Sequence, residues 1–206
     1  MQLHSEEIEL IKNGILFSGT DEAGRGCLAG PVVAASVILR PGICSVEGAN
    51  DSKKLTEKKR TSMIAIIEEN ALAIGVGSAS PEEIDKINIL NAALESMVRS
   101  IAMLTPQPEF LLIDGNKFYD KSIPFRTIIG GDSKCLSIAA ASIIAKVTRD
   151  RYMTEIADSE YPEYGFARHK GYGTREHYRA LEKFGPTPLH RRTFLKKMHA
   201  QPLELF

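Results

Sequence analysis

The order of strand and helix patterns is the feature that most restricts how this chain can fold. Strand character recurs in five stretches, at residues 15–23, 31–39, 72–79, 109–115 and 126–132. A glycine-rich stretch typical of a hairpin separates the first two, whereas later strands follow helical segments. Early strands of this kind form an antiparallel meander, and strands joined through helices lie parallel. The sequence therefore predicts an α/β fold with a mixed sheet flanked by helices.

Helical patterns fill the intervals between these strands. Helices are expected at residues 5–13, from Thr56, from Pro81 to before Pro106, at 134–157 and at 174–185. Ser80 and Glu83 have the spacing of a capping box, which places a helix start at Pro81. The helix at 134–157 has an alanine and isoleucine face, which predicts that it is largely buried. With 206 residues and 43% hydrophobic content, the chain has enough apolar side chains for one substantial core.

The composition excludes several protein classes. The longest mostly apolar run, residues 137–145, is too short to span a bilayer. The N-terminal stretch, residues 1–14, is acidic and amphipathic, unlike a signal peptide. Cys27, Cys44 and Cys135 are odd in number and irregularly spaced, so they indicate neither a disulfide framework nor a zinc site. We therefore expect a cytoplasmic protein without membrane association.

The segment from Arg168 to His199 is strongly basic, although the whole chain has no net charge. Nine lysines and arginines accompany two glutamates there, a net charge of +7, and four of the five histidines lie in the same segment. Four aromatic residues are interleaved with them: Tyr172, Tyr178, Phe184 and Phe194. Such a segment is either a solvated helix surface or a face that binds nucleic-acid phosphates and bases.

Four carboxylates stand near the predicted carboxyl ends of three strands, where ligand sites of open α/β sheets gather. They are Asp21, Glu22, Asp114 and Asp132. Each acid alone has an ordinary explanation as a turn residue, a helix cap or a solvated strand end. If all four converge, their mutual repulsion requires a cation, and oxygen-only ligands suit Mg²⁺ or Mn²⁺. Two such ions about 3.5–4 Å apart form the clamp that serves in-line displacement at a phosphodiester.

Seven motifs in order resemble the bacterial ribonuclease HII family over almost the whole chain. They are GTDEAGRGCLAGPVVAA, NDSKKL, SPEEID, LIDGNK, GGDSKCLSIAAASIIAKVTRDR, HKGYGT and HRRTF. The resemblance implies a ribonuclease-H-like fold, with a five-stranded mixed sheet and a small helical C-terminal part. It divides the chain into a catalytic core at 1–160 and a helical substrate-binding segment at 161–206. It also implies a metal-dependent endonuclease that cuts on the 5′ side of ribonucleotides embedded in duplex DNA or in RNA/DNA hybrids, leaving a 3′-hydroxyl and a 5′-phosphate.

The resemblance also assigns roles to residues. The metal ligands match Asp21, Glu22, Asp114 and Asp132. The family's Gly-Arg-Gly, matching Gly24, Arg25 and Gly26, recognises the ribose 2′-hydroxyl, the group that distinguishes RNA from DNA. Further family positions match Tyr172, which packs on the neighbouring deoxyribose, and the phosphate-holding Lys53 and Lys146. Arg191 and Arg192 are weaker phosphate candidates, because they can instead brace the fold through salt bridges.

Departures from the family pattern are minor. Cys27 stands where many members have proline, and we interpret it as a small filler of the hairpin. The Gly-Arg-Gly motif disfavours the related ribonuclease HIII.

The last six residues, Gln201–Phe206, are similar to peptides that dock on bacterial sliding clamps. They can equally pack on their own domain.

Two other functions stay open. A DNA-only nuclease of the same fold group, such as a junction resolvase, would share the acids but have no use for Gly-Arg-Gly or Tyr172. A non-catalytic nucleic-acid-binding module would need the basic segment but not four convergent acids.

Overall fold

The computed structural model describes residues 3–43 and 57–196, and a five-stranded sheet lies at its centre. Its strands are β1 (Phe17–Ala23), β2 (Val32–Leu39), β3 (Ala71–Ala79), β4 (Phe110–Asp114) and β5 (Phe125–Ile128). They lie in the order β3-β2-β1-β4-β5. The pairs β1–β2 and β2–β3 are antiparallel, and β1–β4 and β4–β5 are parallel. The predicted meander followed by parallel strands is therefore confirmed.

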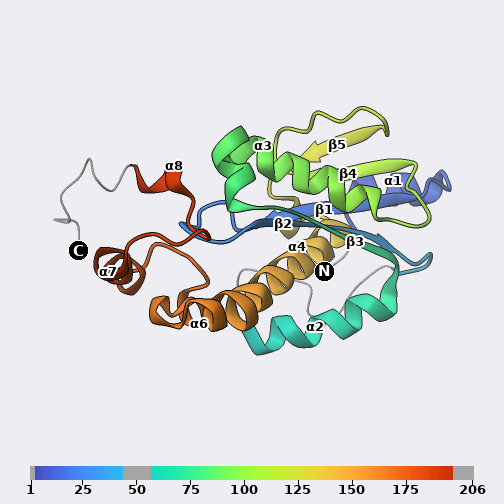
Figure 1. Ribbon diagram of the computed structural model, residues 1–206. Helices are drawn as coiled ribbons and strands as arrows, with labels where there is room; N and C mark the ends of the chain where they lie inside the picture. The colour runs from blue at the N-terminus through green and yellow to red at the C-terminus, as the bar shows by residue number, and fades with distance from the viewer. Residues whose placement is uncertain (1–2, 44–56, 197–206) are drawn as a thin grey trace.

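Helices cover both faces of this sheet. The longer ones are α1 (Ser5–Lys12), α2 (Glu57–Asn70), α3 (Pro81–Ala102), α4 (Leu136–Arg151) and α7 (Arg175–Phe184). The short ones are α5 (Asp158–Glu160), α6 (Phe166–His169) and α8 (Arg192–Leu195). Figure 1 shows α3 on one face, α2 and α4 on the other, and the C-terminal helices gathered at one end of the sheet. Among the helices of residues 3–43 and 57–196, none combines the length and apolar character needed to cross a bilayer.

The helix α4 is the central buried element, as its alanine and isoleucine face predicts. Most of its residues are buried, and it packs on β1 and β2. The carboxylate of Glu7, on α1, is fully buried and accepts hydrogen bonds from the backbone amides of Leu136 (3.0 Å) and Ser137 (2.8 Å). A side chain 129 residues away along the chain therefore caps α4.

The expected helix over 134–157 is found from Leu136 onward, but its C-terminal part is not α-helical. A π-helical turn, Tyr152–Ala157, follows α4. The Thr154 hydroxyl donates to the Asp150 carbonyl (2.8 Å), a contact that commonly distorts helices. The expected strand at 126–132 is also too long, because β5 ends at Ile128 and a 3₁₀ turn, Gly131–Ser133, follows.

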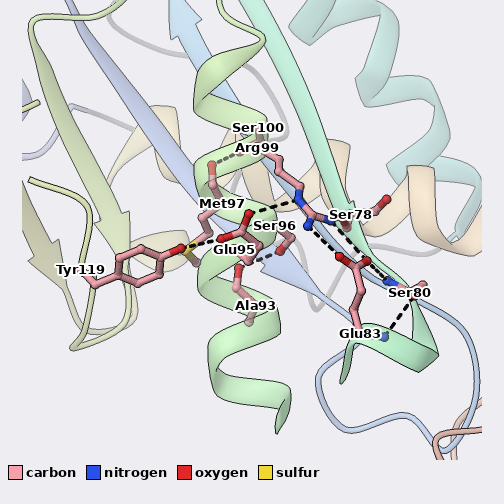
Figure 2. A network of polar contacts seen from close by, with 10 residues as sticks. All are labelled: Ser78, Ser80, Glu83, Ala93, Glu95, Ser96, Met97, Arg99, Ser100 and Tyr119. Atoms are coloured by element: carbon pink, nitrogen blue, oxygen red, sulfur yellow. Dashed lines mark hydrogen bonds and ion pairs between the residues drawn. The ribbon is translucent and has the colours of Figure 1, made fainter. Parts of the chain in front are cut away.

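The helix α3 begins with the predicted capping box of Ser80 and Glu83. Arg99 joins this cap to the sheet, because its guanidinium donates to the Glu83 carboxylate (2.6 Å) and to the Ser78 carbonyl (2.7 Å), as Figure 2 shows. The nearby Arg99 guanidinium lowers the pKa of Glu83 to about 2. Asn88, with φ of 66°, kinks the helix, which the sequence pattern did not indicate.

Candidate active site

Asp21 and Asp114 are neighbours on adjacent parallel strands. The register of β1 and β4 aligns Thr20 with Ile113, and the next residue on each strand is Asp21 and Asp114. Asp21 lies near the carboxyl end of its strand, as expected, because β1 ends at Ala23, where the sequence predicted, and pairs Asp21 with Ala35 of β2. The central position of β1 therefore places a buried acid inside the sheet next to the acid that ends β4.

Asp132 reaches the same region through the turn after β5. The Asp114 carboxylate accepts a hydrogen bond from the Gly131 amide (2.6 Å), the residue directly before Asp132. Asp132 itself is buried. The left-handed conformation of Gly130, with φ of 65°, lets the chain turn back here. The acid thus approaches the site from a tight turn rather than from a strand end.

The electrostatics of Asp21 involve two of the other acids. Burial raises the pKa of Asp21 well above its usual value, and the charges of Glu22 and Asp114 raise it further. Burial also raises the pKa of Glu22, and its ion pair with Arg25 (3.0 Å) opposes that rise. A group of like charges in a desolvated place disfavours ionisation, and a cation would reverse that effect.

The chemistry of these donors fits a hard divalent cation, since all are carboxylates. Across residues 3–43 and 57–196, however, no three histidine, cysteine, aspartate or glutamate groups stand together as they would around an ion. The Glu22 carboxylate is paired with Arg25 instead. The four-carboxylate metal centre therefore stays a prediction, and its donor type and mutual repulsion support it.

The Gly-Arg-Gly motif forms a turn, which we call the glycine turn (residues 24–26), directly after β1. Gly24 has φ of 95°, and a Cβ atom there would overlap the side chain of Arg149. The amide of Cys27 closes the turn on the Gly24 carbonyl (3.5 Å). The Arg25 side chain is about half exposed. The turn thus presents its backbone only two residues after the acidic pair.

Arg191 supports the glycine turn from the inside of the protein. Its side chain is fully buried, and its guanidinium donates to the carbonyls of Gly24 (2.7 Å), Arg25 (2.9 Å) and Gly30 (3.0 Å). Of the two expected roles, Arg191 has the bracing one, but it braces the fold through backbone carbonyls and not through a salt bridge. Arg192 has an exposed side chain, and its backbone amide donates to Asp85 (2.8 Å).

Tyr172 and Lys146 lie side by side. The Lys146 ammonium is 5.2 Å from the centre of the Tyr172 ring, and it pairs with Asp150 (2.6 Å). Tyr172 is 39% exposed, so part of its ring is open to a ligand. Burial and the neighbouring Cys27 raise the pKa of Tyr172. Lys53 and the tail, Gln201–Phe206, lie outside the described residues.

The basic segment is only in part a surface. His169, His177 and His190 are buried, and burial lowers the pKa of His177 and of His190 to about 4. Tyr178 and Phe194 are half-buried against a cluster of buried apolar side chains, whereas Phe184 is 47% exposed. The expectation that histidines and aromatic residues together form a nucleic-acid face is therefore wrong for the three histidines, because they pack inside the C-terminal helices.

Comparisons with known proteins agree on one family. Residues 18–199 match the model of a family described as Ribonuclease HII. The chain is 54% identical over 181 residues to the Ribonuclease HII of Acetivibrio thermocellus, covering 88% of this chain and 70% of that protein. It is 51% identical over 187 residues to the Ribonuclease HII of Clostridioides difficile, covering 91% and 72%.

Solved structures show the same architecture. The ribonuclease H2 of Pyrococcus horikoshii OT3 superposes with a TM-score of 0.71 at 25% identity, over 90% of this chain and 99% of the other. The RNase HII in a PCNA complex from Archaeoglobus fulgidus also gives 0.71 at 25% identity, over 86% and 94%. A Bst-RNase HIII solved with Mn²⁺ gives 0.64 at 20% identity, over 90% and 69%, a likeness of fold alone.

Proposed function

The chain belongs to the ribonuclease HII family and is an endoribonuclease with ribonuclease H activity, and on that premise we propose its substrate and cleavage site. The enzyme hydrolyses the phosphodiester on the 5′ side of ribonucleotides embedded in duplex DNA, single ones included. It leaves a 3′-hydroxyl and a 5′-phosphate.

One observation carries this proposal: Asp21, Glu22 and the glycine turn belong to one continuous stretch of backbone. Asp21 lies beside Asp114 in the sheet, and the glycine turn begins two residues after Glu22. A group that binds the turn is thereby placed next to the acids. Such proximity is what a nuclease needs if it cuts beside the nucleotide that it recognises.

In this proposal Asp21, Glu22, Asp114 and Asp132 hold Mg²⁺ or Mn²⁺, with two ions expected. The bound ions would supply Lewis-acid chemistry at the phosphodiester oxygens. Buried carboxylates with raised pKa values are suited to this role, because a cation removes the repulsion that burial intensifies.

The remaining residues recognise the nucleic acid. The backbone of Gly24, Arg25 and Gly26 binds the 2′-hydroxyl, for which closely approaching backbone groups are needed. Tyr172 packs on the sugar of the following deoxynucleotide, where a further hydroxyl would clash. Lys146 beside it, together with Lys53, holds phosphates.

The test is a labelled DNA duplex with one ribonucleotide, incubated with the protein and Mg²⁺ or Mn²⁺. We expect a cut that requires the metal and the ribonucleotide, and no cut in the matched all-DNA duplex. Equal cutting of both duplexes would favour the DNA-only nuclease. Binding without cutting under every metal condition would favour a non-catalytic binding module.

A further inference from the structure

Arg191 is a buried charge whose hydrogen-bond partners among the described residues are all backbone carbonyls, and its guanidinium carbon lies 5.3 Å from the centre of the Phe194 ring. Burial lowers the pKa of Arg191 to about 10, and the described residues offer it no carboxylate within ion-pair distance. Burying a guanidinium without a carboxylate costs desolvation free energy, and its three hydrogen bonds to carbonyls offset part of that cost. Two of the three go to the glycine turn, at Gly24 and Arg25.

The residue before it, His190, is connected to Tyr172. The Tyr172 carbonyl can only accept, so the Nδ1 of His177 (2.9 Å away) carries a proton. In the neutral ring the other nitrogen of His177 then accepts from the Nε2–H of His190 (2.9 Å). The Nδ1 of His190 is left to accept from the Thr187 amide (3.0 Å). Each ring nitrogen of His177 and His190 is thus either a donor or an acceptor, and the assignments agree with one another.

Backbone hydrogen bonds directly join the hairpin loop after β1, the turn before Tyr172 and the segment before α8. The Leu28 amide donates to the Gly171 carbonyl (2.8 Å), and the Arg191 amide donates to the Leu28 carbonyl (2.9 Å). Ala29 and His190 form an isolated antiparallel bridge. The hairpin loop after β1, the turn before Tyr172 and the segment before α8 are therefore packed as one unit.

We propose that His190 and Arg191 are positioning residues that hold the two proposed sugar-recognition elements, the glycine turn and Tyr172, at a fixed separation. Arg191 sets the glycine turn through its hydrogen bonds to the carbonyls of Gly24 and Arg25, and its third hydrogen bond, to Gly30, anchors the guanidinium next to the turn. His190 sets Tyr172 through His177. This inference rests on the proposed function for its catalytic consequence, but the bracing itself is a property of the free protein.

The first test compares Arg191→Lys with Arg40→Lys. A lysine keeps the charge but cannot donate to three carbonyls at once. Arg40 is a matched control, since its guanidinium also donates to a backbone carbonyl, that of Glu69 (3.1 Å), but it is exposed and lies past the far end of β2. Hydrogen exchange of the peptide containing residues 24–27 is measured without metal or substrate, followed by kcat and KM on the single-ribonucleotide duplex.

We expect Arg191→Lys to exchange at least tenfold faster in this peptide and to lose at least tenfold in kcat/KM. Arg40→Lys should stay within twofold of the original protein in both. Unchanged exchange of residues 24–27 in Arg191→Lys overturns the proposal, whatever the activity. If the original protein leaves the ribonucleotide duplex intact, the proposed function is wrong. The hydrogen exchange of residues 24–27 still tests whether Arg191 braces the glycine turn.

The second test uses a pair of substitutions at His190. The amide nitrogen of Gln can reach the position of Nε2 and donate to His177, whereas the side chain of Asn is too short to place its amide nitrogen there. The readout is the ratio of kcat/KM for a ribonucleotide followed by DNA to that for a ribonucleotide followed by RNA. We expect His190→Asn to lower this ratio at least fivefold and His190→Gln to keep it within twofold. Equal ratios in both variants and in the original protein would overturn the role of His190.

Discussion

Replacing Gly24 by alanine should destabilise the protein strongly, whereas the same change at Gly26 should not. At Gly24 the new Cβ would meet a positive φ and would overlap Arg149, a fully buried side chain. Arg149 cannot move freely, because its guanidinium donates to the carbonyls of Pro31 (2.9 Å), Lys170 (2.9 Å) and Ala29 (3.0 Å).

The magnitude follows from two contributions to the free energy of unfolding. A non-glycine residue in this backbone region costs about 1–3 kcal/mol. Displacing Arg149 loses at least one hydrogen bond from a charged donor, about 1.5–3 kcal/mol. Together they predict a loss of roughly 2.5–6 kcal/mol, a large part of a typical stability of about 5–15 kcal/mol.

Gly26 provides the matched control. Its φ is not positive, and a Cβ there would meet no atom within 4 Å. The free energy of unfolding of Gly26→Ala should therefore lie within about 1 kcal/mol of that of the original protein. Because a methyl group there would stand where the proposed sugar contact forms, its kcat/KM on the ribonucleotide duplex should still fall. Urea denaturation of both variants is the assay, and a Gly24→Ala protein as stable as Gly26→Ala would refute the reasoning.

Four further predictions concern the acids, the histidines, Tyr172 and the C-terminal tail. Asp21→Asn should nearly abolish turnover while raising stability, because burial and neighbouring acids already disfavour its charge; unchanged turnover would contradict its assignment. His190 and His177 have pKa values lowered to about 4, so the unfolded chain binds more protons than the folded one between pH 6.5 and 4, and stability should fall as the pH falls. At pH 5 each histidine should lower the free energy of unfolding by about 2 kcal/mol relative to pH 7, which a urea midpoint measures. His190→Gln should show a shallower dependence of stability on pH, and identical slopes would speak against a buried neutral His190. Tyr172→Ala should lower the preference for a ribonucleotide followed by DNA more than it lowers stability, and an unchanged preference would remove Tyr172 from recognition. Deleting residues 201–206 should abolish binding to a sliding clamp if the tail docks there, and unchanged affinity or no binding by the full chain would end that hypothesis.

The sheet and the positions of the acids were predictable because they depend on local patterns. Strand periodicity and the helices between strands predicted the five strands and a mixed sheet, whereas the order that makes β1 and β4 neighbours comes from the structure. Parallel pairing then brings Asp21 and Asp114 together without any knowledge of side-chain contacts. The turn at Asp132 was less predictable, because the strand pattern continues beyond the point where pairing stops at Ile128.

The support around the site was not predictable, because it depends on contacts between distant segments. Arg191 reaches Gly24 across 167 residues, and Glu7 caps α4 across 129. In the sequence, Arg191 is one of several basic residues near the C-terminus, and its charge indicates a surface. Only the packing shows that the guanidinium is buried and pairs with carbonyls.

The same reasoning explains the error over the histidines. A cluster of histidines among lysines and arginines is typical of a nucleic-acid face, but the count does not specify burial. In the folded protein His169 and His177 stack at 4.4 Å between ring centres, and His177 contacts His190. Burial keeps these rings neutral, so they connect segments instead of contributing positive charge.

In the proposed function the glycine turn selects the ribonucleotide, and the adjacent acids determine the bond that is cut. The most direct test places one ribonucleotide at successive positions of the same DNA duplex and maps each product at single-nucleotide resolution with Mg²⁺ or Mn²⁺. We predict that the cut moves with the ribonucleotide, always on its 5′ side, and leaves a 3′-hydroxyl. A cut that stays at one sequence position, or that falls on the 3′ side of the ribonucleotide, would contradict the account.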